Sequence, residues 1–164
     1  MKDQWSLLIS MAALLASEAS ATTKRPAIYT PAPGSAERTA IVKTLHSVDG
    51  SGSRFTFGEF RVFRQGSRAI AYVRGEGAVG YFQALLKRDG KAPWRKVWGE
   101  SDGGSDSCEA GAEHYDWALR LLRTFTIAPE ALFPGVISRT AELKEQAKTD
   151  AELQCVGDLD GGPE

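Results

Sequence analysis

The sequence predicts an α+β domain in which an N-terminal helix packs on a four-stranded antiparallel meander that is followed by two further helices. The first observation behind this prediction is the stretch 54–100, where apolar and aromatic residues recur between Gly-rich breaks. Runs of this length bounded by turn residues are typical of an antiparallel meander. The second is that helical amphipathic patterns precede and follow the stretch. A length of 164 residues favours one domain.

The first helix is predicted to begin after Ser35, a good N-cap residue, and to end in the polar run 49–53. Its apolar side chains recur at i, i+3, i+4 and i+7, as an amphipathic helix requires. Such a stripe needs an apolar partner, so we expect the helix to lie on the concave face of the sheet. The stripe consists of Ile41, Thr44, Leu45 and Val48.

Large apolar residues fall on both faces of the expected strands. A sheet of this kind is either covered on both sides or carries a partner on one of them. The sequence leaves these two alternatives open. The strands are expected near Phe55–Phe63, Arg68–Val73, Gly80–Lys87 and Trp94–Glu100.

Periodicity and composition also predict the segments after the sheet. A polar loop at Glu100–Glu109 precedes a broadly apolar helix at Ala110–Thr124, which is expected to be mostly buried. A compact connector at 127–134 leads to a third helix, capped by its first residue, at Ser138–Leu153. Because that helix is charged almost all round, packing alone is expected to hold it weakly. The acidic, Gly-rich tail at 157–164 is predicted to be disordered.

The first 21 residues match a secretory signal peptide. A short apolar run follows Lys2 and leads to the A-x-A sequence Ala19-Ser20-Ala21, which predicts cleavage before Thr22. The alternative is an N-terminal membrane anchor, but the run is too short to span a bilayer of ~30 Å comfortably. We therefore expect a periplasmic or secreted protein with no stable membrane anchor after cleavage. The predicted parts are a signal peptide (1–21), an extended leader (22–33), a single α+β domain (34–156) and the tail (157–164).

Both cysteines, Cys108 and Cys155, lie in the predicted mature chain. Two cysteines in an exported protein most simply form one disulfide bond. The loop between them is long, so its entropic contribution to stability is about 4 kcal/mol as an upper figure. Two free thiols are an alternative, whereas a Cys-His catalytic pair is less favoured because neither cysteine has a recognisable nucleophile context. The bond would hold the far end of the third helix, and its reduction is expected to loosen that helix first.

Six short sequences carry a family resemblance. They are Gly34–Ile41, Phe60–Val62, Ala69–Val73, Ala84–Arg88, Trp94–Val97 and Leu132–Pro134. They are similar to a group of small exported proteobacterial proteins of unassigned function, which look like the cystatin-like α+β roll shared with nuclear transport factor two. The resemblance implies a helix cradled by a curved antiparallel sheet and brings no catalytic residues. Arg68 departs from it, since such proteins often carry an aromatic residue there, and so does the longer charged C-terminal helix.

The sequence Gly75–Gly80 matches the G-x-G-x-x-G pattern of dinucleotide-binding loops and follows a predicted strand. A dinucleotide site also needs a helix next and further βαβ units. Residues 81–86 could form that helix, but the chain then turns at Asp89-Gly90 into another strand. A Gly-rich hairpin is therefore the favoured interpretation, and no cofactor is expected.

Histidines and acidic residues define no metal or catalytic site. His46 and His114 lie near the ends of different predicted helices, whereas zinc needs three or four closely spaced ligands. A Ser-His-Asp triad stays open, although no G-x-S-x-G sequence is present. The acidic loop residues lack the alternating spacing and closing glutamate of a calcium loop. These acidic residues are Asp102, Asp106, Glu109, Asp158 and Asp160.

Basic residues concentrate on the meander, whereas the tail is acidic. The formal net charge is −1, so no global positive field would collect nucleic acid. Solvated charges that keep the sheet soluble are the favoured interpretation. The alternative is that they bind a small anionic ligand or an acidic protein partner. The residues concerned are Arg61, Arg64, Arg68, Arg74, Lys87, Arg88, Arg95 and Lys96.

The leading hypothesis is an exported, non-enzymatic domain that binds a protein partner or a small ligand through its sheet. The rival is a hydrolase or isomerase-type enzyme that uses the cavity of the roll, with His46 or Glu59 as general base. An inward-facing histidine or carboxylate with a perturbed pKa would favour catalysis, whereas a filled apolar interior would favour a binding module. The ligand-binding candidates are Arg61, Arg68, Tyr72 and Trp98.

Overall fold

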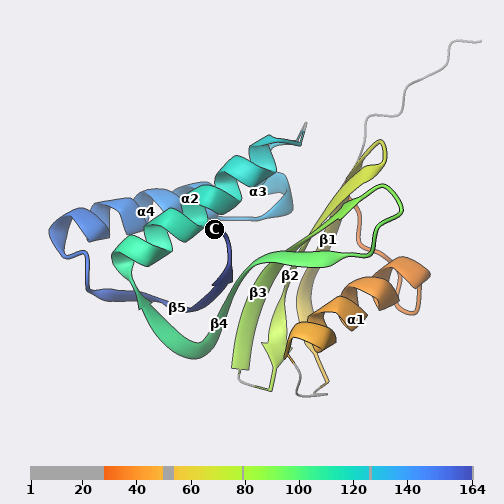
Figure 1. Ribbon diagram of the computed structural model, residues 1–164, viewed down its shortest axis with the longest axis horizontal. Helices are drawn as coiled ribbons and strands as arrows, with labels where there is room; N and C mark the ends of the chain where they lie inside the picture. The colour runs from red at the N-terminus through yellow and green to blue at the C-terminus, as the bar shows by residue number, and fades with distance from the viewer. Residues whose placement is uncertain (1–27, 50–53, 79, 126, 164) are drawn as a thin grey trace, which may run out of the picture.

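Four hairpin-connected strands pair in sequence order, as the alternating pattern of the meander predicts, and a fifth strand completes the sheet (Figure 1). The computed structural model describes residues 28–49, 54–78, 80–125 and 127–163. All four neighbouring strand pairs are antiparallel. The elements are α1 (Ala36–Asp49), β1 (Thr56–Gln65), β2 (Arg68–Gly77), β3 (Gly80–Asp89), β4 (Arg95–Ser107), α2 (Cys108–Arg123), α3 (Pro129–Leu132), α4 (Val136–Thr149) and β5 (Gln154–Gly161).

The fold is α+β, but the predicted number and order of elements are wrong. The sheet has five strands instead of four, and the fifth follows three described helices rather than closing the meander. The expected polar loop Glu100–Glu109 is mostly the second half of β4, and the tail expected to be disordered contributes to β5. These strand segments carry few apolar residues. Backbone pairing at the sheet edge and hydrogen bonds of polar side chains stabilise them instead. No hydrophobic alternation therefore revealed them.

The observed helix boundaries show where local sequence patterns were sufficient to predict the start of a helix. α1 begins as predicted, with the backbone N–H of Arg38 donating to Ser35 Oγ at 3.3 Å. The third expected helix instead begins at Val136, two residues before the expected cap Ser138, and ends at Thr149. Its start is stabilised by Glu130, whose carboxylate accepts hydrogen bonds from the backbone N–H groups of residues 135 and 137, at 2.6 and 2.7 Å. A cap supplied by the preceding helix leaves no local sequence pattern.

Helices cover both faces of the sheet, so the first of the two alternatives holds. Figure 1 shows α1 on one side of the sheet and α2, α3 and α4 on the other. The stripe of α1 packs through Ile41 and Leu45 on a cluster that includes Val62, Ala71 and Leu86. The opposite cluster joins the second sheet face to α2, α3 and α4. Its fully buried members include Phe63, Ile70, Leu85, Trp98, Leu122, Leu132 and Leu143.

The charged helix, which was expected to be held weakly, buries a narrow stripe of side chains. In α4, Val136, Thr140 and Leu143 are buried at i, i+4 and i+7, and the Thr140 hydroxyl donates to the carbonyl of Val136 at 2.6 Å. A narrow stripe is enough here because α2 lies directly beside α4 (Figure 1). The helix is therefore held by packing along one face, while its charged residues lie on the others.

The predicted signal peptide, residues 1–21, lies outside the described residues, as do the first six residues of the expected leader. The rest of the leader is attached to the edge of the sheet, because Tyr29 and Val62 exchange two backbone hydrogen bonds of 3.0 and 2.8 Å. Within the described ranges, no helix is both long enough and apolar enough to cross a membrane.

Candidate functional site

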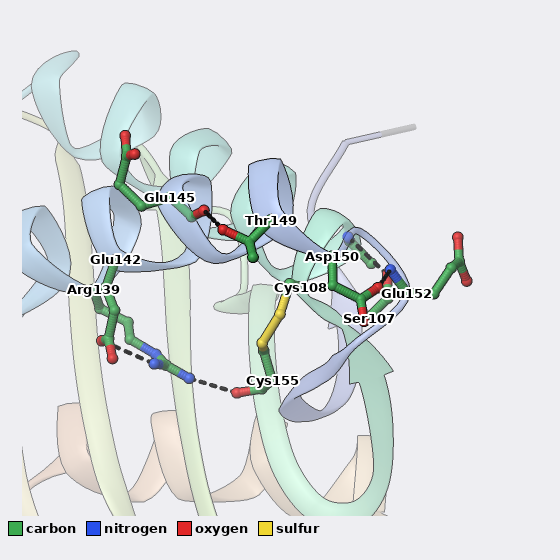
Figure 2. The surroundings of a disulfide bond; sticks show 10 residues. Ser107, Cys108, Arg139, Glu142, Glu145, Thr149, Asp150, Glu152 and Cys155 are labelled. Carbon is green, nitrogen blue, oxygen red and sulfur yellow. Dashed lines mark hydrogen bonds and ion pairs between the residues drawn. A yellow bond between two sulfur atoms is a disulfide. The ribbon is translucent and has the colours of Figure 1, made fainter.

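The predicted disulfide is present between Cys108, the first residue of α2, and Cys155 in β5, with the two Cα atoms 4.8 Å apart (Figure 2). The hydroxyl of Ser107 caps α2 by accepting from the backbone N–H of Ala110 at 3.1 Å. On the other side, Arg139 of α4 donates to the carbonyl of Cys155 at 2.6 Å. The bond therefore joins α2 to β5, whereas it was expected to hold the end of the charged helix. α4 contacts the disulfide region through the hydrogen bond from Arg139.

Two of the predicted ligand-binding residues, Arg61 and Tyr72, lie opposite each other on β1 and β2. Arg61 forms an ion pair with Glu59, with Nη2 and Oε2 2.8 Å apart. Tyr72 is buried, stacks on Phe133 with ring centroids 4.3 Å apart, and donates to Gln83 Oε1 at 3.0 Å. Burial raises the pKa of Tyr72. Both side chains are thus engaged within the fold.

The other two predicted residues lie elsewhere. Trp98 is fully buried, stacks on His114 and donates from Nε1 to the carbonyl of His114 at 3.1 Å. Arg68, at the start of β2, donates to Thr124 Oγ1 at 3.1 Å, and its guanidinium lies over the Phe125 ring, 4.3 Å from the centroid. The structure therefore brings Arg61 and Tyr72 together, places Trp98 under α2, and uses Arg68 to attach the end of α2.

A buried polar network crosses the sheet beneath α2. Gln83 of β3 donates from Nε2 to Glu100 Oε2 at 2.9 Å and to the hydroxyl of Tyr115 at 2.6 Å. The Tyr115 hydroxyl also donates to the Glu100 carboxylate, and the backbone N–H of Gly157 donates to its other oxygen at 3.0 Å. Burial raises the pKa of Tyr115, which keeps the hydroxyl protonated as a donor. Sequence reasoning missed this network, because a lone Gln and Glu on a strand give no pattern.

His114 is buried between α2 and the sheet. Its Nε2 lies 2.9 Å from the carbonyl of Gly99, a geometry in which the ring nitrogen donates. Burial lowers the pKa of His114, and the hydrogen bond to Gly99 and the nearby carboxylate of Asp160 only partly oppose this effect. The residue is therefore a neutral core histidine.

This burial predicts a pH dependence of stability. Because the folded pKa of His114 lies below its usual value of about 6.5, the unfolded chain binds the proton more readily. The stabilising contribution is present above about pH 6.5 and is lost as the pH falls toward the folded pKa. We expect the unfolding free energy to fall between about pH 7 and 5.5, and to fall less in His114→Gln. Urea denaturation across this range is the measurement, and equal pH slopes in both proteins would contradict the prediction.

The two residues considered as alternative general bases lie in different parts of the fold. Glu59 lies between two guanidinium groups, with Arg61 Nη2 at 2.8 Å and Arg74 Nη2 at 3.4 Å from its two oxygens. His46 is on α1, on the opposite face of the sheet from α2, and its ring stacks on Phe55. Between the sheet and α2–α4 the interior is filled by packed side chains.

The remaining sequence motifs have structural roles. Gly77 of β2 pairs with Gly80 of β3, so β3 begins at the last glycine of this sequence, where a dinucleotide site would need a helix. Among the loop acids, Asp102 accepts a hydrogen bond from the backbone N–H of Tyr81, and Asp106 accepts one from Leu159, both at 3.0 Å. In the described part of the chain, no group of three His, Cys, Asp or Glu side chains is arranged to hold a metal ion.

A cavity of about 560 Å³ lies where the ends of β3 and β4 meet α2 and the C-terminal segment. Three basic residues of the meander, Lys87, Arg95 and Lys96, line it together with Trp117 and Leu121 of α2. No carboxylate belongs to the described residues that line this cavity. We call it the basic cavity. It brings together three of the eight basic residues that the sequence placed on the meander, but none of the four predicted ligand-binding residues.

Each of the two lysines of the basic cavity has a carboxylate partner. The side chains of Lys87 and Lys96 are 19% and 18% exposed, so both are largely removed from water. Lys87 pairs with Asp89 at 2.9 Å, and Lys96 pairs with Asp160. Arg95 forms no ion pair with a described carboxylate, so one of the three cations is left without a partner charge, and neither carboxylate lines the cavity. The cavity walls therefore carry an excess of positive charge in a partly desolvated place, where an anion is attracted more strongly than at an open surface.

Comparison of the chain with models of protein families, with curated proteins and with solved structures finds no match. The resemblance to exported proteins with a cystatin-like roll thus stays a prediction. Of the lining of the basic cavity, sequence reasoning identified the cations but missed the aromatic wall and the C-terminal segment. The i, i+4 spacing of Trp117 and Leu121 is visible in the sequence, but it is equally typical of a helix face that packs on the core.

Proposed function

We propose that this protein is an exported, non-enzymatic domain that binds a small anionic ligand through its sheet, in the basic cavity. The observation that carries the proposal is the convergence of Lys87, Arg95 and Lys96 on one cavity whose described lining holds no carboxylate. Cavities of about 300–1,000 Å³ hold small molecules, and a few convergent charged groups give them specificity. A guanidinium beside ammonium groups suits carboxylate or phosphate recognition.

The filled interior supports binding over catalysis. The stacked rings of Tyr72 and Phe133, together with the Trp98 ring, whose centroid lies 5.2 Å from that of Phe133, belong to the packed core between the sheet and the helices, where the rival hypothesis would need a cavity. Glu59, the carboxylate considered as a base, has both oxygens near guanidinium groups. A ligand in the basic cavity would need no rearrangement of this core.

Export is proposed on separate grounds. The disulfide between Cys108 and Cys155 is of the kind that persists in oxidising compartments such as the periplasm. The apolar run and the sequence Ala19-Ser20-Ala21 match a cleavable signal peptide. N-terminal sequencing of the protein expressed with its leader would test this proposal. Mature material that begins at Thr22 supports export, and intact material from the cytoplasm contradicts it.

Removing two cavity cations should weaken anion binding. In Lys87→Gln/Arg95→Gln, we expect acetate and phosphate to bind about tenfold more weakly than in the wild type. The measurement is a ¹H–¹⁵N NMR titration that follows backbone amides of the cavity walls. The control is Lys91→Gln/Arg123→Gln, which removes the same charge from exposed residues outside the basic cavity. Equal affinities in the two double variants would overturn the proposed function.

A further inference from the structure

Besides its cations, the basic cavity has a wall of apolar side chains. Trp117 and Leu121 lie one turn apart on the same side of α2, and both are partly buried against the core. Val97 of β4 adds a third apolar side chain. An indole and two aliphatic side chains beside a charged group are the surroundings that an amphipathic small molecule requires.

The C-terminal segment forms a wall of main chain. Gly161 and Gly162 have φ angles of 68° and 90°, in the region that favours glycine. A Cβ atom on Gly161 would lie 2.7 Å from the carbonyl oxygen of Val97, and one on Gly162 would lie 2.6 Å from His114 Nδ1. The backbone N–H of Gly162 donates to the carbonyl of Val97 at 2.9 Å. This wall is therefore fixed by close packing, and the basic cavity is formed before any ligand enters.

The volume and the lining of the basic cavity both favour a ligand larger than a bare inorganic ion. A cavity of about 560 Å³ is much larger than one phosphate or sulfate ion. Such an ion would engage the cations and leave the indole of Trp117 in contact with water. A ligand that carries an apolar ring next to its charge would remove that surface from water as well, which adds affinity. A flat ring also suits stacking on an indole.

We infer, on the basis of the proposed function, that the basic cavity binds an aryl carboxylate: a flat apolar ring that bears one carboxylate group. The carboxylate pairs with Arg95 and the neighbouring lysine ammonium groups, and the ring packs on Trp117 and Leu121. The two walls thus have separate roles, because the cations recognise the charge and α2 recognises the ring.

Three probes test the two walls separately: benzoate, acetate and benzamide, each titrated into the oxidised full-length mature protein. Acetate has the charge without the ring, and benzamide has the ring without the charge. We expect benzoate to bind about tenfold or more tightly than either. The indole N–H resonance of Trp117 should shift with benzoate, while that of Trp94, which does not line the basic cavity, stays in place. Intermolecular NOEs between benzoate ring protons and the Trp117 ring would place the ring directly.

The outcomes distinguish this inference from the proposed function. If acetate binds as tightly as benzoate, the aryl class is wrong and anion binding stands. If benzamide binds as tightly as benzoate, charge plays no part, and the inference and the proposed function are both wrong. The same conclusion follows if no probe binds. In the variant Trp117→Leu, most of the difference in affinity between benzoate and acetate should be lost, while the affinity for acetate stays the same. Because Trp117 also packs on the core, the NOE measurement on wild-type protein decides the matter if that variant does not fold.

Discussion

Replacing Glu100 with alanine is expected to lower the free energy of unfolding by about 3–4 kcal/mol. The Glu100 carboxylate accepts hydrogen bonds from Gln83, from the Tyr115 hydroxyl and from the backbone N–H of Gly157. These donors belong to β3, α2 and β5, so one carboxylate connects three elements. Its removal leaves donors unpaired beneath α2, and each buried unsatisfied group costs about 1–3 kcal/mol.

Urea denaturation measures this effect, with Glu142→Ala as the matched control. Glu142 is exposed and pairs with Arg139 on the surface of α4, so its replacement should change stability by less than about 1 kcal/mol. In a double-mutant cycle with Tyr115→Phe, the two substitutions should cost less together than the sum of their separate costs, because they remove the same hydrogen bond. A loss below about 1 kcal/mol in Glu100→Ala would mean that the network contributes little to stability.

Removing the disulfide is expected to cost about 2–4 kcal/mol and to loosen β5 before any other element. The Cys108–Cys155 bond closes a sequence separation of 47 residues, which gives a large chain-entropy contribution. β5 is a short edge strand whose one buried side chain is Val156. α4, by contrast, is held by its own buried stripe. The structure thus moves the expected site of loosening from the helix to the strand.

Hydrogen exchange of the oxidised protein and of Cys108→Ala/Cys155→Ala would test this expectation. Amides of 154–161 should lose protection most, and those of β2 and β3 should change least, since these two strands lie inside the sheet. Greater loss in α4 than in β5 would contradict the prediction. Two free thiols in protein isolated from the periplasm would show that the bond does not form in the cell.

Local patterns determined the meander and the first helix. Alternating apolar side chains between glycine turns are a property of consecutive residues, so 54–100 was sufficient to predict four paired strands. Ser35 and the stripe that contains Ile41 and Leu45 predicted α1 in the same way. The disulfide also followed from the sequence, because a chain with two cysteines can form only one intramolecular bond.

Only the tertiary structure decided where β5, the Glu100 network and the basic cavity lie. Each depends on residues far apart in the chain: Glu100 meets Gly157, and Lys96 meets Asp160. β5 is stabilised by backbone hydrogen bonds to β4 and by the disulfide, and neither needs the apolar alternation by which a strand is recognised. The same strand carries Gly161 to the edge of the basic cavity. A polar edge strand therefore leaves no periodic pattern in the sequence, and the sites that it completes become visible only once the chain is folded.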